Sequence, residues 1–206
     1  MSWRLRLAES GGGAMMDLGI HLIDLVHYLL GDIKQVRAET RAFYKMRPSQ
    51  TNPSQSEPVD VDDWCLASLE LAGGIPGTVE VNRLAAGSGE ETIFEVYGTL
   101  GSVAYQHTYP DTALIYDLKR KLWMRGGPNL SVDAPERKLE VVYPSSKFSQ
   151  GDMTNRHMAS QHDFLLNLKE NKPAVVDFNT AYQAQRVVDA AYRSSAQDGA
   201  WIKLPQ

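Results

Sequence analysis

Four polar side chains recur at spacings of four, three and four residues in an otherwise apolar segment: Asp17, His21, Asp24 and Tyr28. Residues three and four apart share a face of an α-helix, so these groups form one narrow polar ridge. An imidazole can take a hydroxyl proton near neutral pH, and a neighbouring carboxylate can orient the imidazole or the substrate. The ridge therefore favours an acid–base pair in a substrate pocket, with His21 as the base and Asp17 as its partner.

Two other interpretations of the ridge stay open. In the first, Asp17 pairs locally and His21 is a core histidine with satisfied hydrogen bonds. In the second, Asp17 and His21 hold a divalent metal ion, with Asp24 one turn further along as an additional ligand. Burying two carboxylates and an imidazole in an apolar helix is costly unless they pair or line a cavity, which favours a functional site. We predict the acid–base pair and no metal site.

Three glycines directly precede this helix, at positions 11 to 13. Glycine lets the backbone approach a ligand closely, and the free amides of a helix N-terminus favour partial negative charge. Gly12 and Gly13 are therefore predicted to bind substrate, with a flexible loop as the alternative. Asp24 joins them as a predicted substrate-binding residue because it lies on the ridge.

Periodicity and turn residues predict the elements that must position these groups. Helices are expected over residues 14–30, ended by Gly31, over 155–169, and from a capping box at Thr180 and Gln183. Residues 47–60 are expected to form an exposed loop. Strands are expected over residues 36–44, 64–71, 75–84, 92–97, 102–107, 112–116, 121–125, 139–143 and 201–204.

Successive strands joined by short turns indicate an antiparallel sheet. We therefore predict an α+β fold, a largely antiparallel open β-sheet with helices on one face, forming a single domain over residues 1–206. The uncovered face would expose apolar side chains, which predicts a homodimer or tetramer through the sheet. The side chains concerned are Trp64, Leu66, Phe94 and Val96.

Composition limits the partners and the location. A net charge of −4 over 206 residues disfavours nucleic acid, because phosphate binding needs a basic face. The single cysteine, Cys65, excludes an internal disulfide and a multi-cysteine zinc site. The apolar stretch 18–30 is interrupted by polar residues and is short for a bilayer span, and no secretory signal is recognisable. We therefore expect a cytoplasmic protein without a membrane partner.

Residues 11–24, with the pattern Gly-Gly…Asp-x-Gly-x-His-x-x-Asp, resemble the signature helix of the glucose–fructose oxidoreductase / inositol dehydrogenase (Gfo/Idh/MocA) family. The preceding segment 2–4 resembles the strand end that leads into that helix. Residues 96–102 and 183–201 resemble later parts of the same domain. The resemblance implies a fold like the C-terminal domain of glyceraldehyde-3-phosphate dehydrogenase.

The resemblance also implies an NAD(P)-dependent dehydrogenase acting on a sugar, polyol or related secondary alcohol. His21 would be the general base and Asp17 would hydrogen-bond in the same site. Family members often present a pocket residue near the end of the long strand, which suggests Arg83 as substrate-binding. His157 on the late helix is added as a residue that could face the pocket.

The nucleotide-binding half is not recognisable. No Gly-x-Gly-x-x-Gly follows a strand, and Lys172-Pro173 reads as ordinary helix termination rather than the family's catalytic lysine motif. We therefore expect the N-terminal Rossmann domain to be absent from this chain, no cofactor to bind it, and the isolated chain to be inactive. The alternatives are a non-catalytic sugar-binding or dimerisation module and a metal-binding protein that uses Asp17, His21 and Asp24.

Overall fold

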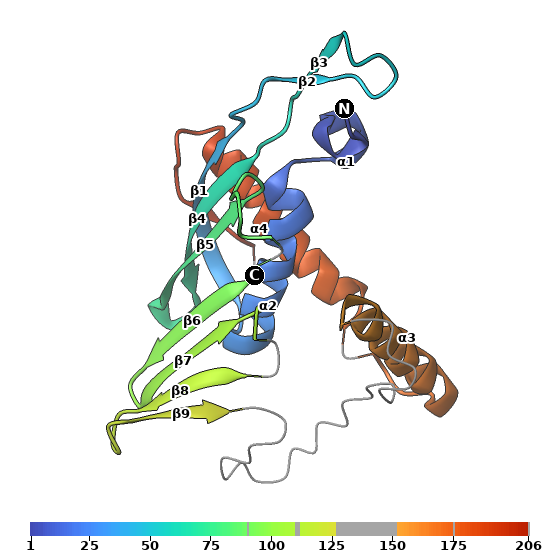
Figure 1. Cartoon of the computed structure of the whole chain (residues 1–206). Coiled ribbons are helices and arrows are strands. Elements are labelled where there is room, and N and C mark those ends of the chain that lie inside the picture. Colours follow the sequence, from blue (N-terminus) through green and yellow to red (C-terminus); the bar gives the residue numbers. More distant parts are fainter. Residues whose placement is uncertain (90, 110–111, 127–151, 175, 206) are drawn as a thin grey trace. The chain divides into compact units, whose positions relative to one another are not determined.

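The computed structural model describes residues 1–89, 91–109, 112–126, 152–174 and 176–205 (Figure 1). For residues 152, 153, 155 and 156 it describes the backbone alone. The chain divides into two compact units. The first comprises residues 1–85 and 175–206, and the second comprises residues 86–174.

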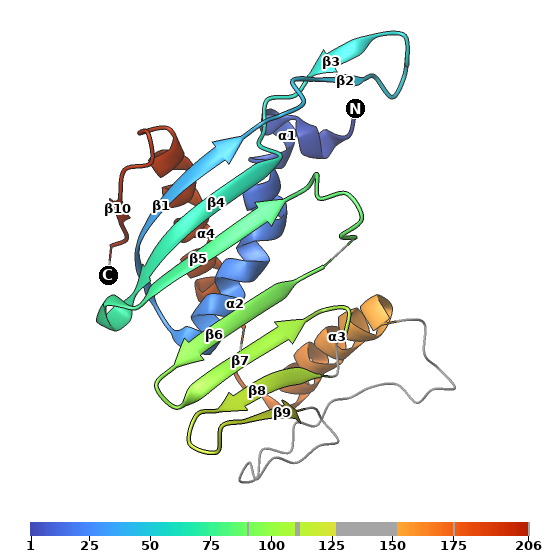
Figure 2. The same cartoon turned by 60° about the vertical axis from the view of Figure 1, so that its left-hand side comes forward.

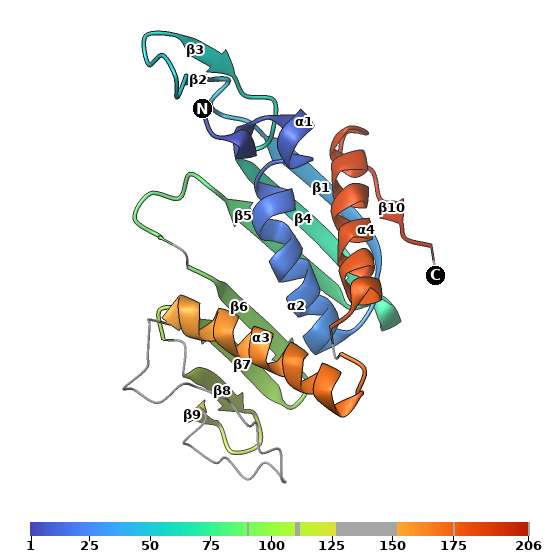
Figure 3. The same cartoon turned by 90° about the vertical axis from the view of Figure 1, so that its right-hand side faces the viewer.

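The first unit contains a four-stranded antiparallel sheet in the order β10-β1-β4-β5. Helices α2 and α4 cover one face of this sheet, which Figure 3 shows from the helix side and Figure 2 from the opposite side. The predicted α+β architecture, with helices on one face of antiparallel strands, is confirmed. The elements are α2 (Ile20–Leu30), β1 (Ile33–Arg41), β4 (Trp64–Leu71), β5 (Pro76–Asn82), α4 (Phe178–Ser195) and β10 (Ile202–Lys203).

Alternation along the strands and a helical stripe build the core of this unit. In β4 every second side chain is buried, including Cys65 and Leu69, because successive residues of a strand point to opposite faces. Helix α4 packs on this face through a stripe of small and β-branched residues that the helical spacing predicts. Four of its predicted members, Ala184, Val187, Val188 and Ala191, are buried, and the fifth, Ser195, is half-buried.

Helix α4 begins one turn earlier than predicted. Its N-cap is Asp177, whose carboxylate accepts a hydrogen bond from the amide of Thr180. The capping box is therefore formed by Asp177 and Thr180, rather than by Thr180 and Gln183 as predicted. The loop predicted over residues 47–60 is also corrected. It contains a two-stranded antiparallel ribbon of β2 (Met46–Pro48) and β3 (Ser56–Pro58).

The second unit is a four-stranded antiparallel meander in the order β6-β7-β8-β9. Its hairpins lie where turn residues predicted them, while the strand predicted over residues 139–143 lies outside the described residues. The described strands thus form separate hydrogen-bonded sheets, and the single domain over 1–206 stays a prediction. The elements are β6 (Ile93–Gly98), β7 (Gly101–Gln106), β8 (Ala113–Asp117), β9 (Leu122–Gly126) and α3 (Asp152–Glu170).

The helix that carries the polar ridge departs from the sequence expectation in two ways. Its first turn, Met15–Gly19, is π-helical, and α2 continues from Ile20 until Gly31 ends it as predicted. Only one side of the helix packs on the sheet, so much of its apolar surface, including Leu18 and Leu29, is exposed. A helix that is apolar around most of its circumference is expected to lie in a core, and this expectation is wrong for this chain.

The start of the chain also differs from expectation. The segment predicted as a strand end is a 3₁₀ turn, Trp3–Leu5, followed by the short helix α1, Leu7–Ser10. By length and hydropathy alone, the helical stretch Leu7–Leu30 could cross a membrane, although core helices of soluble proteins meet the same criterion. The absence of a membrane partner stays a prediction.

The sheet side chains expected to mediate oligomerisation differ in exposure. Leu66 is exposed, whereas Trp64, Phe94 and Val96 are half-buried within their own units. Assembly through the sheet stays a prediction.

Cys65 is fully buried in β4, and its burial together with the nearby Asp62 charge raises the pKa of the thiol to about 12. The thiolate is the reactive form, so folding should keep this cysteine protonated at every pH at which the protein is handled. We expect an aromatic disulfide reagent at pH 8 to label Cys65 only after denaturation. Rapid labelling of the folded chain would contradict the burial.

Candidate functional site

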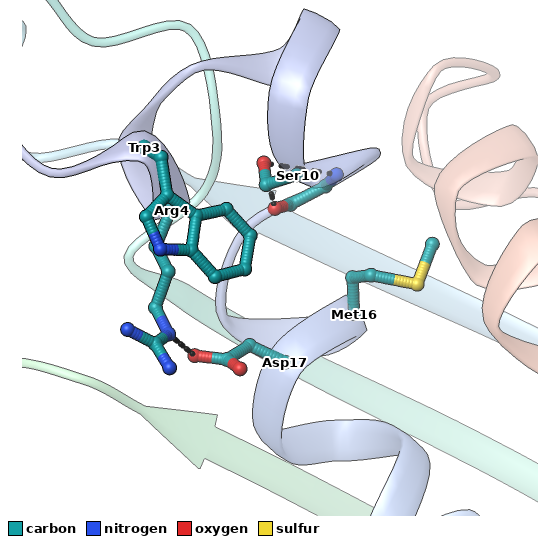
Figure 4. Close-up of a pocket in the computed structure, with 6 residues that line it drawn as sticks. Trp3, Arg4, Ser10, Met16 and Asp17 are labelled. Atoms are coloured by element: carbon teal, nitrogen blue, oxygen red, sulfur yellow. Dashed lines mark hydrogen bonds and ion pairs between the residues drawn. The ribbon is translucent and has the colours of Figure 1, made fainter.

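A pocket of about 170 Å³ lies in the first unit where the start of the chain meets the π-helical turn (Figure 4). It brings together a carboxylate, a guanidinium, an indole and a hydroxyl, which are groups that can contact a polyhydroxylated ligand. The lining residues are Trp3, Arg4, Ser10, Gly12, Met16 and Asp17.

Asp17 stands on the π-helical turn and is held by two cations through one oxygen. Arg83 Nη2 donates to Asp17 Oδ2 at 3.1 Å, and Arg4 Nε lies 3.6 Å from the same oxygen. Within the part of the chain that the structure describes, Oδ1 has no hydrogen-bond partner. The second oxygen of Asp17 is therefore available to accept a hydrogen bond from a ligand.

Arg83 follows β5, which places its side chain against the helix. Its side chain is 20% exposed, and its Nη1 is buried without a hydrogen-bond partner among the described residues. A buried guanidinium nitrogen of this kind is costly to leave unpaired. Arg83 does not itself line the pocket, so its observed part is to hold Asp17 through Nη2, and its direct contact with substrate stays a prediction.

Trp3 and Arg4 form the opposite wall of the pocket and were assigned no chemistry in the sequence. The Arg4 guanidinium lies over the Trp3 ring, 4.8 Å from its centroid, and Trp3 is 51% exposed (Figure 4). An exposed indole offers an apolar face that can contact C–H groups of a ligand, with polar groups alongside. Their proximity to Asp17 depends on the 3₁₀ turn that replaces the expected strand end.

Gly12 and Gly13 have a structural explanation that the sequence did not provide. The amides from Gly13 to Met16, expected to be free for a ligand, are all bonded to Asp62 or Tyr192. A Cβ on Gly12 would lie 2.6 Å from Tyr192 Oη, and one on Gly13 would lie 2.1 Å from the Asp62 carbonyl oxygen. Glycine is thus needed for packing. Direct contact of these residues with substrate stays a prediction, and only Gly12 lines the pocket.

The other predicted residues are less closely grouped. His21 follows Asp17 on the helix but is exposed and does not line the pocket, while Asp24 is half-buried. His157 lies on α3 in the second unit and is exposed. Across the described residues there is no cluster of three or more metal-ligating side chains, so the metal interpretation of the ridge gains no support.

Two residues that shape the site were missed because they are remote in the sequence. Asp62 and Tyr192 lie 47 or more positions from the amides that they bind. Asp62 and Asp63 form a polar pair directly before an apolar strand, a signal that could have indicated a buried carboxylate. Tyr192 lies next to the predicted apolar stripe of α4, where a tyrosine is ordinarily read as packing.

Comparison with known proteins gives consistent matches over the whole chain. A model described as "Oxidoreductase family, C-terminal alpha/beta domain" matches residues 1–204. Levoglucosan dehydrogenase of Pseudarthrobacter phenanthrenivorans is 27% identical over 100% of this chain and 55% of its own length. The chain therefore spans about half the length of this relative.

Solved structures agree with this assignment. A levoglucosan dehydrogenase in complex with NADH superposes with a TM-score of 0.84 at 28% identity, covering 100% of this chain and 54% of that one. A complex with NADH and levoglucosan gives 0.82 at 27% identity, again with 100% and 54% coverage. An oxidoreductase domain protein from Kribbella flavida gives 0.82 at 26%, covering 100% of this chain and 55% of its own. The chain belongs to the glucose–fructose oxidoreductase / inositol dehydrogenase family of oxidoreductases, whose C-terminal α/β domain it carries.

Proposed function

We propose that this chain forms the substrate side of an NAD(P)-dependent oxidoreductase that acts on a secondary hydroxyl of a sugar or polyol. The observation that carries the proposal is the Asp17 carboxylate, fixed through Oδ2 by Arg83 and Arg4 while Oδ1 stays available beside a pocket. A carboxylate oriented in this way can accept a hydrogen bond from a substrate hydroxyl and select its position.

Each remaining group has a separate part in the proposed chemistry. The exposed His21 imidazole accepts the proton of the substrate hydroxyl as it is oxidised to a carbonyl. Arg83 holds the Asp17 carboxylate in place through Nη2 and so orients it for the substrate hydroxyl. Trp3 contacts an apolar face of the ring. The hydride that leaves the carbinol carbon needs an acceptor, which a bound NAD or NADP would supply.

The glycine run at residues 11–13 does not offer a site for a dinucleotide pyrophosphate. The amides from Gly13 to Met16 are already bonded to Asp62 and Tyr192, so they are not free to bind a pyrophosphate. The similar structures include levoglucosan dehydrogenase complexes with NADH, levoglucosan and L-sorbose, which supports a sugar substrate for this chain and NAD or NADP bound by a separate N-terminal half. On this proposal the isolated chain does not turn over, and the cytoplasm stays its predicted location.

Sugar binding to the chain can be tested without a cofactor. Nuclear magnetic resonance of the ¹⁵N-labelled chain should show saturable shifts of the Trp3 indole and Arg83 guanidinium signals on titration with levoglucosan, myo-inositol or D-glucose. Trp201 serves as an internal control, because its ring contacts Arg37 rather than the pocket. Equal, non-saturating shifts of Trp3 and Trp201 with every sugar would contradict the proposal.

A further inference from the structure

The four consecutive amides from Gly13 to Met16, at the start of the signature helix, are held by two residues from distant parts of the chain. Asp62 accepts from Gly13 N through Oδ1 at 3.0 Å, from Met15 N through Oδ2 at 2.9 Å, and from Ala14 N through its carbonyl oxygen at 2.9 Å. The first amides of a helix have no partner within the helix, so this carboxylate replaces the missing local cap.

Tyr192 completes the cap from helix α4. Its hydroxyl accepts from Gly13 N at 2.9 Å and from Met16 N at 3.2 Å, and it donates to Asp62 Oδ1 at 2.7 Å. Burial, the Asp62 charge and the hydrogen bond to Asp62 together raise the pKa of Tyr192. The hydroxyl therefore keeps its proton throughout the pH range in which the protein is handled and can always donate to Asp62.

Asp17 follows directly on the capped amides. Its own amide donates to Gly13 O at 3.0 Å, and the peptide group that carries Gly13 O is held by the hydrogen bond from Ala14 N to the Asp62 carbonyl oxygen. The capped amides of Met15 and Met16 belong to the π-helical turn, and such turns are frequent at functional sites. The direction in which the Asp17 side chain leaves the helix thus depends on how Asp62 and Tyr192 hold this turn.

We propose that Asp62 and Tyr192 are positioning residues, which hold the π-helical turn so that the Asp17 carboxylate meets Arg83 and presents its second oxygen to the substrate. The relevance to catalysis rests on the proposed function, whereas the positioning of Asp17 does not. A displacement of a reacting group by about 1 Å can cost roughly 100-fold in rate, so a cap that fixes one turn can matter even though neither residue lines the pocket.

The test compares Tyr192→Phe with Ser194→Ala in the whole chain. Ser194 lies on the same helix and is fully buried, and its hydroxyl accepts from Ala38 N at 2.8 Å and donates to Ala200 O at 2.6 Å. Ser194→Ala therefore also removes a buried hydroxyl with a donor and an acceptor partner, but away from the signature helix. A second variant, Asp62→Asn, keeps the size of the side chain and serves if Tyr192→Phe does not fold.

Three measurements on the chain alone give the result: the ¹³C shift of the Asp17 carboxylate, hydrogen exchange at Met16 N–H, and affinity for the sugar that shifts Trp3. We expect Tyr192→Phe and Asp62→Asn to move the Asp17 signal, to speed exchange at Met16 by about 10-fold, and to weaken sugar binding. Ser194→Ala should lower the melting temperature by a similar amount to Tyr192→Phe, yet change none of these three measurements.

The outcomes separate the two proposals. If the ¹³C shift of the Asp17 carboxylate in Tyr192→Phe and Asp62→Asn is the same as in Ser194→Ala, the positioning role is overturned, whatever the sugar affinity. A shifted Asp17 signal in a chain whose pocket binds no sugar would support positioning and count against the proposed function instead. A shifted signal with weakened sugar binding would support both.

Discussion

Replacing Asp17 by asparagine should lower kcat/KM by about 100-fold to 10,000-fold in a polypeptide that joins this chain to a dinucleotide-binding half. The amide keeps the shape of the carboxylate but loses its charge, so it no longer pairs with Arg83 and Arg4 or strongly accepts a substrate hydroxyl. The loss should appear with every sugar that is a substrate. Steady-state kinetics of dinucleotide reduction, followed by absorbance, measures it.

Stability must be separated from chemistry in this experiment. Asp17 is 38% exposed, so the loss of its ion pairs should cost only about 1 kcal/mol of folding free energy. Asp32→Asn is a matched control, because it removes an exposed carboxylate that pairs with Lys34 away from the pocket. If both variants had the parental kcat/KM, Asp17 would have no catalytic part and the site would have to be sought elsewhere.

Introducing a methyl group at Gly13 should produce the largest loss of stability among single substitutions at the site. A Cβ there would lie 2.1 Å from the Asp62 carbonyl oxygen and 2.5 Å from the Asp62 amide nitrogen. Both are backbone atoms, which cannot rotate away. Gly13→Ala should therefore cost about 3 kcal/mol, the upper part of the usual range for overpacking. In a chain of this size that corresponds to a melting temperature lower by about 6–12 °C.

Gly77→Ala is the control for this substitution. A Cβ at Gly77 would make ordinary contact, 3.6 Å from Leu71 Cδ1, and alanine also restricts the unfolded chain. Its melting temperature should match or slightly exceed that of the parent in calorimetry. Similar melting temperatures for the two variants would show that the segment holding Gly13 can move away from Asp62. The close packing of Gly13 against Asp62 would then be contradicted.

Local patterns predicted most of the secondary structure because they report local physics. Alternation of apolar residues located β4 within its observed limits, and glycine pairs located the hairpins, since both depend on neighbours in sequence. The stripe on α4 identified the buried face of that helix. The capping box was misplaced by one turn, because Thr180 can serve either as the cap or as its partner three residues later.

The parts that failed depend on tertiary contacts. Helical periodicity assumed a regular α-helix through Asp17 and His21, whereas a π-helical turn carries the first and leaves the second exposed. The apolar circumference of α2 suggested complete burial, although the sheet covers only one side. Arg83 was named from family resemblance, but its partner Asp17, 66 residues away, could not be identified without coordinates.

The cap described above also has a consequence for biosynthesis. Gly13 and Tyr192 are 179 residues apart, so at a synthesis rate of about 5–20 residues per second the turn waits roughly 9–36 s for its partner to be translated. During that interval the apolar helix that contains the π-helical turn and α2 has neither its cap nor α4 beside it. Nascent chains of this protein should accordingly recruit holdase chaperones at the ribosome, and shortening the chain before α4 should yield insoluble material rather than a smaller folded unit.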